Sequence, residues 1–365
     1  MIASSDLPRP LVVASLLGVL GGVLGLQSCS TTLPPVSTHE PPPSTDTPSD
    51  TVMEPPLSLE PLTWTESTPS PVALYEAQGL ALAGELYVFG GYYNRQIQAT
   101  TNTYALNPAS TTWRSLSPLP EPVTHAGQAA YGDDIYLAGG FIGDHPGPAT
   151  NHVWVYATDR DAWFAGPSLP EARGGGALVQ LDGKLHYFGG TVRNGFDYLF
   201  DTGDHWVLNL ASGGKTWAEA APMPEPRNHM AGVALGGKLY AVGGQRLDEE
   251  DAGNSPYVHV YDPVTDGWQR VADLPKPIGH ISAVTFAYGE RIFIVGGVSQ
   301  QRAKLRDVIA YDPRADRWSE FKGLPGGRSA AVAGELDGKL YLATGYSGGP
   351  LATTWVGTFG HSEPE

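Results

Sequence analysis

The chain has 365 residues, a formal net charge of −16 and a single cysteine, Cys29. An acidic chain does not attract phosphate backbones, so nucleic acid is not an expected partner. One cysteine excludes an intramolecular disulfide and any thiolate cluster for zinc or iron–sulfur. The 46 glycines, 32 prolines, nine tryptophans and seventeen tyrosines favour an all-β chain with many tight turns.

The first 28 residues have the pattern of an export signal. Residues 11–26 form an uncharged apolar run that is short for a bilayer span and typical of a signal-peptide core, with Arg9 before it. The run ends in Leu26-Gln27-Ser28-Cys29, which resembles the bacterial lipobox. The resemblance implies that residues 1–28 are removed and that Cys29 is lipidated, although Gln27 departs from the usual small residue. An ordinary signal peptide with Cys29 as an incidental thiol, or a permanent membrane helix, is the alternative.

Residues 29–61 are rich in Ser, Thr, Pro and acidic residues and contain few large apolar side chains. Such a segment cannot bury enough surface to offset the entropy of ordering it, so we expect a disordered tether. Together with a lipidated Cys29, this predicts an extracytoplasmic protein held on a membrane by its lipid anchor.

Glycine doublets recur about every 50 residues through the rest of the chain. They are Gly90-Gly91, Gly139-Gly140, Gly189-Gly190, Gly243-Gly244, Gly296-Gly297 and a degenerate last copy, Thr344-Gly345. Each ends a short apolar β pattern and follows a turn signal such as Asp182-Gly183, so each copy predicts a hairpin.

A second repeat has the same period. Its tryptophans stand 26 residues before the doublet, or 28 in the fifth case: Trp64, Trp113, Trp163, Trp217, Trp268 and Trp318. Leu-Pro or Met-Pro pairs lie between tryptophan and doublet. This set resembles the kelch repeat, which implies a six-bladed β-propeller over residues 62–360 and a short tail at 361–365.

The position of the repeats also predicts how the ring closes. Trp64 belongs to an outer strand with no blade before it, whereas the last blade, through Trp355, has no such tryptophan after it. We therefore expect the N-terminal strand to complete the last blade and remove the open sheet edges.

Candidate ligand-binding residues follow from the same count. The residue sixteen before the doublet is Leu74, Val123, Arg173, Arg227, His280 or Arg328, and the residue fourteen before it is Glu76, His125, Gly175, His229, Ser282 or Ala330. Residues two apart on a strand share one side of the sheet. The predicted site at the channel mouth is therefore Glu76, His125, Arg173, Arg227, His229, His280 and Arg328.

The fifth blade carries a two-residue insertion, and counting from Leu274-Pro275 instead places His280 at the level of His125. For each arginine the alternative role is hydrogen bonding between blades; for the histidines it is a polar, hydrated channel. No metal and no cofactor are expected, because ring positions on separate blades are poorly placed to converge on one ion. The longer loops add Asp144, His145, Arg193, Asn194, Phe196, Tyr198, His205 and residues 248–251 as candidates.

The expected function is recognition of a protein or an acidic glycan by a monomer, at the face bearing the Leu-Pro-x-x-Arg loops. The arginines favour a ligand with a carboxylate. An alternative is a sugar-handling enzyme similar to the exported sialic acid mutarotases. A copper oxidase resembling galactose oxidase is excluded, because that family has seven blades and a Cys–Tyr crosslink. This chain has six repeats, and its one cysteine, Cys29, lies outside them. Enzymatic activity is left open by the sequence.

Overall fold

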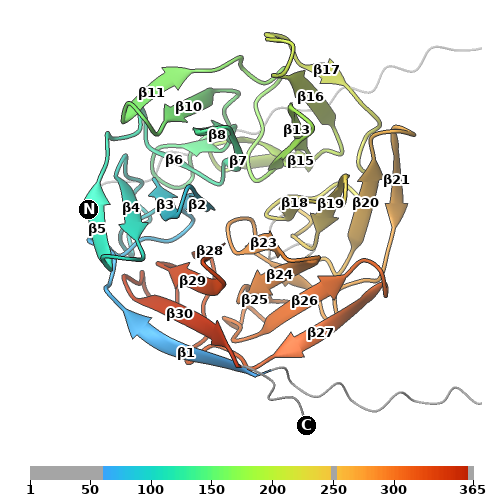
Figure 1. The fold of residues 1–365 in the computed structure, drawn as a ribbon. Helices are drawn as coiled ribbons and strands as arrows, with labels where there is room; N and C mark the ends of the chain where they lie inside the picture. The colour runs from blue at the N-terminus through green and yellow to red at the C-terminus, as the bar shows by residue number, and fades with distance from the viewer. Residues whose placement is uncertain (1–60, 248–252, 361–365) are drawn as a thin grey trace, which may run out of the picture. The chain divides into compact units, whose positions relative to one another are not determined.

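The protein is described by a computed structural model that covers residues 61–247 and 253–360. Every regular element in these residues is a β-strand, and the strands form six four-stranded antiparallel sheets arranged as blades around a common centre (Figure 1). No helix in this part of the chain is long and apolar enough to cross a bilayer. Residues 1–60, including Cys29 and most of the predicted tether, lie outside the described residues, as do 361–365.

The first three blades run outward from an inner strand in chain order. Blade 1 contains β2 (Gln78–Leu82), β3 (Glu85–Phe89), β4 (Thr103–Asn107) and β5 (Thr112–Ser115). Blade 2 contains β7 (Gly127–Tyr131), β8 (Asp134–Ala138), β10 (Val153–Ala157) and β11 (Ala162–Ala165). Blade 3 contains β12 (Ala177–Leu181), β13 (Lys184–Phe188), β16 (His205–Asn209) and β17 (Ala218–Glu219).

The remaining blades repeat this order. Blade 4 contains β18 (Ala231–Leu235), β19 (Lys238–Val242), β20 (Val258–Asp262) and β21 (Gly267–Arg270). Blade 5 contains β23 (Thr285–Tyr288), β24 (Arg291–Val295), β26 (Val308–Asp312) and β27 (Arg317–Phe321). Blade 6 contains β28 (Val332–Leu336), β29 (Lys339–Ala343), β30 (Thr354–Phe359) and, from the start of the chain, β1 (Leu62–Ser67).

Three two-stranded ribbons lie in the loops between blade strands. They are β6 (Val123–Thr124) with β9 (Phe141–Ile142), β14 (Thr191–Asn194) with β15 (Asp197–Asp201), and β22 (Ile278–Gly279) with β25 (Val298–Ser299).

The burial of each strand explains its composition. Four consecutive residues are buried in the second strand of every blade, because neighbouring blades cover both of its faces. The outer strands face solvent on one side, and every residue of β5 and β11 is exposed or only partly buried. The apolar runs that precede the glycine doublets are therefore the core of the ring.

The doublets join adjacent blades. The second glycine of each doublet donates its amide to a carbonyl sixteen residues before the next doublet, or eighteen in the fifth blade. These bonds are Gly91 to Val123 (3.2 Å), Gly140 to Arg173 (2.8 Å), Gly190 to Arg227 (2.9 Å), Gly244 to Ile278 (2.9 Å), Gly297 to Arg328 (2.8 Å) and Gly345 to Leu74 (2.6 Å). A Cβ at Gly91 would lie 2.7 Å from a backbone oxygen, and its φ is +86°. Glycine is therefore required there.

The tryptophan repeat also links neighbouring blades. Indole Nε1 donates to a backbone carbonyl leaving the blade before: Trp113 to Thr68, Trp163 to Ser117, Trp217 to Pro167, Trp268 to Ala221 and Trp318 to Ala272, at 2.9–3.1 Å. Trp64 makes the sixth such bond, to the carbonyl of Lys322, at 3.3 Å.

The six-bladed fold and its closure by the N-terminal strand are confirmed. β1 pairs with β30 over six residue pairs, from Leu62 opposite Phe359 to Ser67 opposite Thr354. Leu62 is 1% exposed and packs in the hydrophobic core that blades 4, 5 and 6 share. β30 is therefore paired on both sides, and the last blade has four strands like the other five.

Candidate functional site

One residue from each blade has a left-handed backbone just before the inner strand. The six residues, with φ between +49° and +68°, are Glu76, His125, Gly175, His229, His280 and Ala330. Several are joined directly: His229 donates its amide to the Gly175 carbonyl (2.8 Å), Gly175 to His125 (2.9 Å) and Glu76 to Ala330 (3.1 Å). Since five of the six are not glycine, this ring is an unusual backbone conformation that the surrounding blades impose.

The side chains of this ring form one polar cluster. The imidazole centroids of His125 and His229 are 4.6 Å apart, as are those of His229 and His280. Carboxylate Oε1 of Glu76 lies 2.5 Å from Nδ1 of His280, and Oε2 lies 3.3 Å from Nε2 of His125. Four blades therefore contribute to one group of ionisable side chains, and we call Glu76, His125, His229 and His280 the mouth cluster.

An oxygen atom orients each imidazole through Nδ1. Nδ1 of His125 lies 2.8 Å from Oγ1 of Thr124, and the partner of Nδ1 in His229 is Oδ1 of Asn228. The amide group of Asn228 donates to Asp201 at 2.6 Å, so its Oδ1 is the acceptor for His229. In His280 the partner is the Glu76 carboxylate. The acceptor oxygens of Asn228 and Glu76 place the proton on Nδ1 of His229 and His280 and the lone pair on Nε2, whereas the Thr124 hydroxyl can either accept from or donate to His125.

Burial sets the charges of the cluster. Burial lowers the pKa of His125 to about 4 against the opposing effect of Glu76, and lowers the pKa of His229 well below its usual range. Burial alone would raise the pKa of Glu76, but the neighbouring His280 and His125 lower it to about 2. At neutral pH the imidazoles of His125 and His229 are therefore neutral, whereas the Glu76 carboxylate is ionised.

The cluster is the floor of a pocket of about 650 Å³. Loops of blades 1, 2 and 3 form its wall and are joined by backbone bonds, from His145 to the Ile97 carbonyl (3.0 Å) and from Ala149 to the Arg193 carbonyl (2.9 Å). The β14–β15 hairpin adds Phe196, which is 88% exposed. The wall is thus a connected structure that presents one large aromatic side chain beside the cavity.

The expectation that Arg173, Arg227 and Arg328 face the mouth is wrong. They are 3%, 0% and 4% exposed, and none of them lines the pocket. The guanidinium of Arg227 donates to the carbonyls of Gly243 (2.7 Å) and Ala241 (3.0 Å), and that of Arg328 to Thr344 (2.9 Å).

Arg173 likewise turns into its own blade, where it donates to Thr202 (3.3 Å) and to the carboxylate of Asp204 (2.5 Å). The physical reason is that the two counted positions do not share a regular strand. The left-handed residue between blade link and inner strand breaks the alternation, so the first position points into the blade and the second into the mouth. The other blades have Leu74, Val123 and Ile278 at the first position, all buried, which was the available signal.

The remaining sequence candidates divide between wall and core. His145 and Arg193 line the pocket, and Asp144 accepts the Ala99 amide at 2.8 Å. His205 belongs to β16 instead of a loop, is 1% exposed, and contacts His186 through ring nitrogens 3.0 Å apart. Residues 248–251 lie outside the described residues.

The expectation that histidines on separate blades are poorly placed to converge is also wrong, because the ring brings three of them together.

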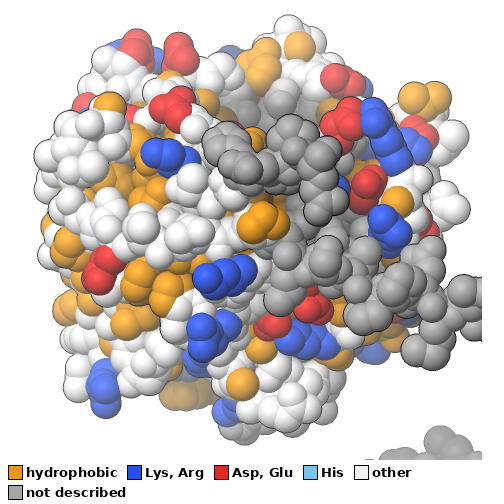
Figure 2. All heavy atoms as spheres, turned by 60° about the horizontal axis from the view of Figure 1, so that its bottom comes forward, with side chains coloured by type: hydrophobic (Ala, Val, Ile, Leu, Met, Phe, Trp, Pro, Cys, Tyr) orange, Lys and Arg blue, Asp and Glu red, His pale blue; other side chains and the backbone are white. Residues whose placement is uncertain are grey.

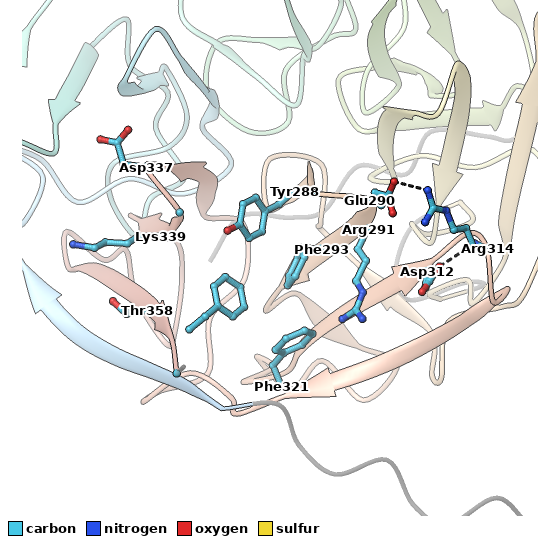
Figure 3. Close-up of a pocket in the computed structure, with 14 residues that line it drawn as sticks. Tyr288, Glu290, Arg291, Phe293, Asp312, Arg314, Phe321, Asp337, Lys339 and Thr358 are labelled. Carbon is cyan, nitrogen blue, oxygen red and sulfur yellow. Dashed lines mark hydrogen bonds and ion pairs between the residues drawn. The ribbon is translucent and has the colours of Figure 1, made fainter. Parts of the chain in front are cut away.

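A second concavity, of about 710 Å³, lies between blades 5 and 6 near the closure (Figure 3). Tyr288, Phe293 and Phe321 gather around it, and Glu290 pairs with Arg314 at its margin (2.5 Å). It shares no lining residue with the mouth pocket. Its aromatic side chains pack against Phe359 of β30, so this hollow belongs to the packing that holds the last blade.

The fold and the repeated blade links define a kelch-type β-propeller. A family model described as the KLHDC2/KLHL20/DRC7 Kelch-repeats domain matches residues 56–223 and 129–345, and the chain belongs to this family.

Curated relatives include Kelch repeat-containing protein At3g27220 of Arabidopsis thaliana, 26% identical over 307 residues that cover 78% of this chain and 71% of that protein. Kelch-like protein 35 of Mus musculus is 28% identical over 279 residues, covering 76% of this chain and 44% of the relative. Kelch-like protein terF of Aspergillus terreus is 26% identical over 256 residues, covering 67% and 55%. The chain thus spans about half the length of the latter two.

Proposed function

We propose that this propeller is a recognition module that binds a protein partner at the mouth pocket. Kelch propellers are generally protein-binding domains, which supports the class of function. The observation that carries the proposal for this chain is Phe196, an exposed aromatic side chain on the rim of a rigidly connected pocket. Large exposed aromatics beside a concavity are typical of the residues that dominate binding energy in protein interfaces.

One face of the molecule has no surface of a single charge that would compete with the pocket as the site. On the face drawn in Figure 2, acidic and basic side chains are scattered among hydrophobic and neutral ones, and no field of one sign covers it. Specificity is therefore expected from shape and from the few polar groups of the pocket.

Acid–base chemistry of the mutarotase kind is less well supported by the mouth cluster. A general acid or base is most effective when its pKa lies near the working pH. The pKa of Glu76 is lowered to about 2 and that of His125 to about 4, so both are far from neutrality. The cluster is better suited to holding a ligand than to exchanging protons with one.

We further propose that residues 1–28 are an export signal and that residues 29–61 tether the propeller to a membrane through acylated Cys29. An extracytoplasmic position supported on a tether would expose the mouth pocket to partners outside the cell. The lipobox-like sequence around Cys29 supports this placement.

The recognition proposal is tested by site-specific photo-crosslinking in the producing cells. A photoreactive aromatic residue replaces Phe196 in one variant and Val264, which is 90% exposed on the β20–β21 turn, in the control. We expect a protein adduct of discrete mass from position 196 alone. The adduct protein, once identified and purified, should bind Phe196→Ala at least about tenfold more weakly than wild type, with Val264→Ala unchanged. Equal crosslinking from both positions, or from neither, contradicts the proposal.

A further inference from the structure

The mouth cluster has the composition and geometry of a transition-metal site. One ring nitrogen of each of His125, His229 and His280 lies within 4.8 Å of one ring nitrogen of each of the other two. We propose that these three histidines bind one divalent transition-metal ion such as Zn²⁺, with the Glu76 carboxylate beside it. The proposal does not depend on the recognition function.

The distances suit a metal ion. Three nitrogens 4.8 Å apart would each lie about 2.8 Å from their common centre, whereas zinc–imidazole bonds are about 2.0–2.1 Å long. Each ligating nitrogen would therefore move by no more than about 0.8 Å, which small side-chain rotations provide. Because the histidines come from blades 2, 4 and 5, the bound ion would link three blades at the centre of the ring.

The hydrogen bonds select the ligating nitrogen. Metal-binding histidines usually donate the N–H of the other ring nitrogen to an oxygen, which fixes the ring and raises its basicity. In this cluster Nδ1 has an oxygen partner in all three rings: Thr124, Asn228 and Glu76. In His229 and His280 the partner is an acceptor, so Nε2 is the nitrogen that offers its lone pair to the ion.

The Glu76 carboxylate lies close to one of the proposed histidine ligands. Oε2 of Glu76 lies 3.3 Å from Nε2 of His125. The negative charge of this carboxylate would attract a divalent cation bound beside it.

Imidazole and carboxylate ligands are compatible with Zn²⁺, Cu²⁺, Ni²⁺ and Fe²⁺ and are a poor set for Ca²⁺ or Mg²⁺, which prefer oxygen alone. Zn²⁺ is the appropriate first probe because it accepts three histidines and a fourth ligand in a tetrahedral site. Co²⁺ is the spectroscopic substitute, since its visible absorption reports the coordination geometry.

The test is titration of tag-free, chelator-treated full-length protein with ZnCl2 in a calorimeter, combined with metal analysis and Co²⁺ absorption. We expect one ion per chain. His229→Gln and His280→Gln should each weaken zinc binding by about 100-fold or more, and Asn228→Ala by about 10–100-fold. The matched control is His145→Gln, which changes a histidine that lines the same pocket outside the mouth cluster. It should bind zinc as wild type does, as should Cys29→Ser.

Thermal melts without metal establish whether each variant is folded. If His229→Gln does not fold, the proposal is judged on His280→Gln, because His280 is less buried than His229. The proposal is overturned if wild type binds no zinc, or if His280→Gln binds it with wild-type affinity.

Discussion

The closure of the ring by β1 predicts a specific sensitivity at Leu62. This side chain is 1% exposed and packs in the core of the last three blades. Leu→Ala substitutions in protein cores destabilise by about 2–5 kcal/mol. Since β1 is an outer strand with room for partial collapse, we expect Leu62→Ala to lower the free energy of unfolding by about 2–3 kcal/mol.

The corresponding change in melting temperature follows from the size of the propeller. For roughly 300 residues, an unfolding entropy of about 2.1 cal/mol/K per residue gives about 0.6 kcal/mol/K in total. Leu62→Ala should therefore lower Tm by about 3–5 °C in differential scanning calorimetry. Thr63→Ala is the matched control, because Thr63 is the next residue of β1 and is exposed.

Hydrogen exchange locates the effect. Amides of β30, which pairs with both β1 and β29, should exchange faster in Leu62→Ala, whereas those of blade 2 should not change. If Leu62→Ala and Thr63→Ala melt together, or if β30 is no less protected, then β1 does not hold the last blade in solution and the reasoning is refuted.

Three further predictions concern the core, acid stability and the anchor. Arg227→Ala should lower the free energy of unfolding by about 3 kcal/mol or more in urea unfolding, because the buried guanidinium of Arg227 donates to carbonyls of its own blade. The control is Arg246→Ala, which removes a half-exposed ion pair with Glu225 at 4.0 Å and should change the free energy of unfolding by under about 1 kcal/mol. Burial lowers the pKa of His186 to about 3 and that of His205 to about 4. The stability that these neutral histidines contribute is therefore complete above pH 6.5 and is lost as pH falls toward the lowered pKa values, by at most about 1.4 kcal/mol per pH unit for each proton. Urea unfolding should give a lower free energy at pH 5 than at pH 7.5, and this difference should be smaller in the double variant His186→Gln/His205→Gln. A fatty acid analogue should label the wild type and not Cys29→Ala, and equal labelling of both would end the anchor proposal.

The blades and their closure could be predicted because the repeated residues are the ones that hold neighbouring blades together. Each doublet and each tryptophan makes the same link to a neighbouring blade, so the same residue is needed at the same place in every copy. Trp64 belongs to an outer strand without a blade of its own, and the last blade lacks an outer strand. The ring can therefore close in one way, with the N-terminal strand completing the last blade.

The mouth cluster was only partly predictable. Counting from the doublets found all four residues, and counting from Leu274-Pro275 placed His280 at the level of His125. The left-handed backbone at these positions was hidden, because only Gly175 among the six is a residue that favours it.

The arginines were misplaced for the same reason. A strand-like alternation was assumed across a segment that turns, and burial of Leu74, Val123 and Ile278 at the matching position shows that it points into the blade. Convergence of the histidines depends on the narrow centre of a closed ring, which spacing along the chain does not express.

The central claim is that four blades bring the side chains of the mouth cluster together into one metal-binding site. These side chains are Glu76, His125, His229 and His280. Diffraction data collected at the zinc absorption edge from crystals grown with ZnCl2 test it most directly. We predict a single strong anomalous peak about 2.0–2.1 Å from a ring nitrogen of each histidine, with the Glu76 carboxylate next to it. Histidine side chains that point away from one another, with no peak between them, would contradict the claim.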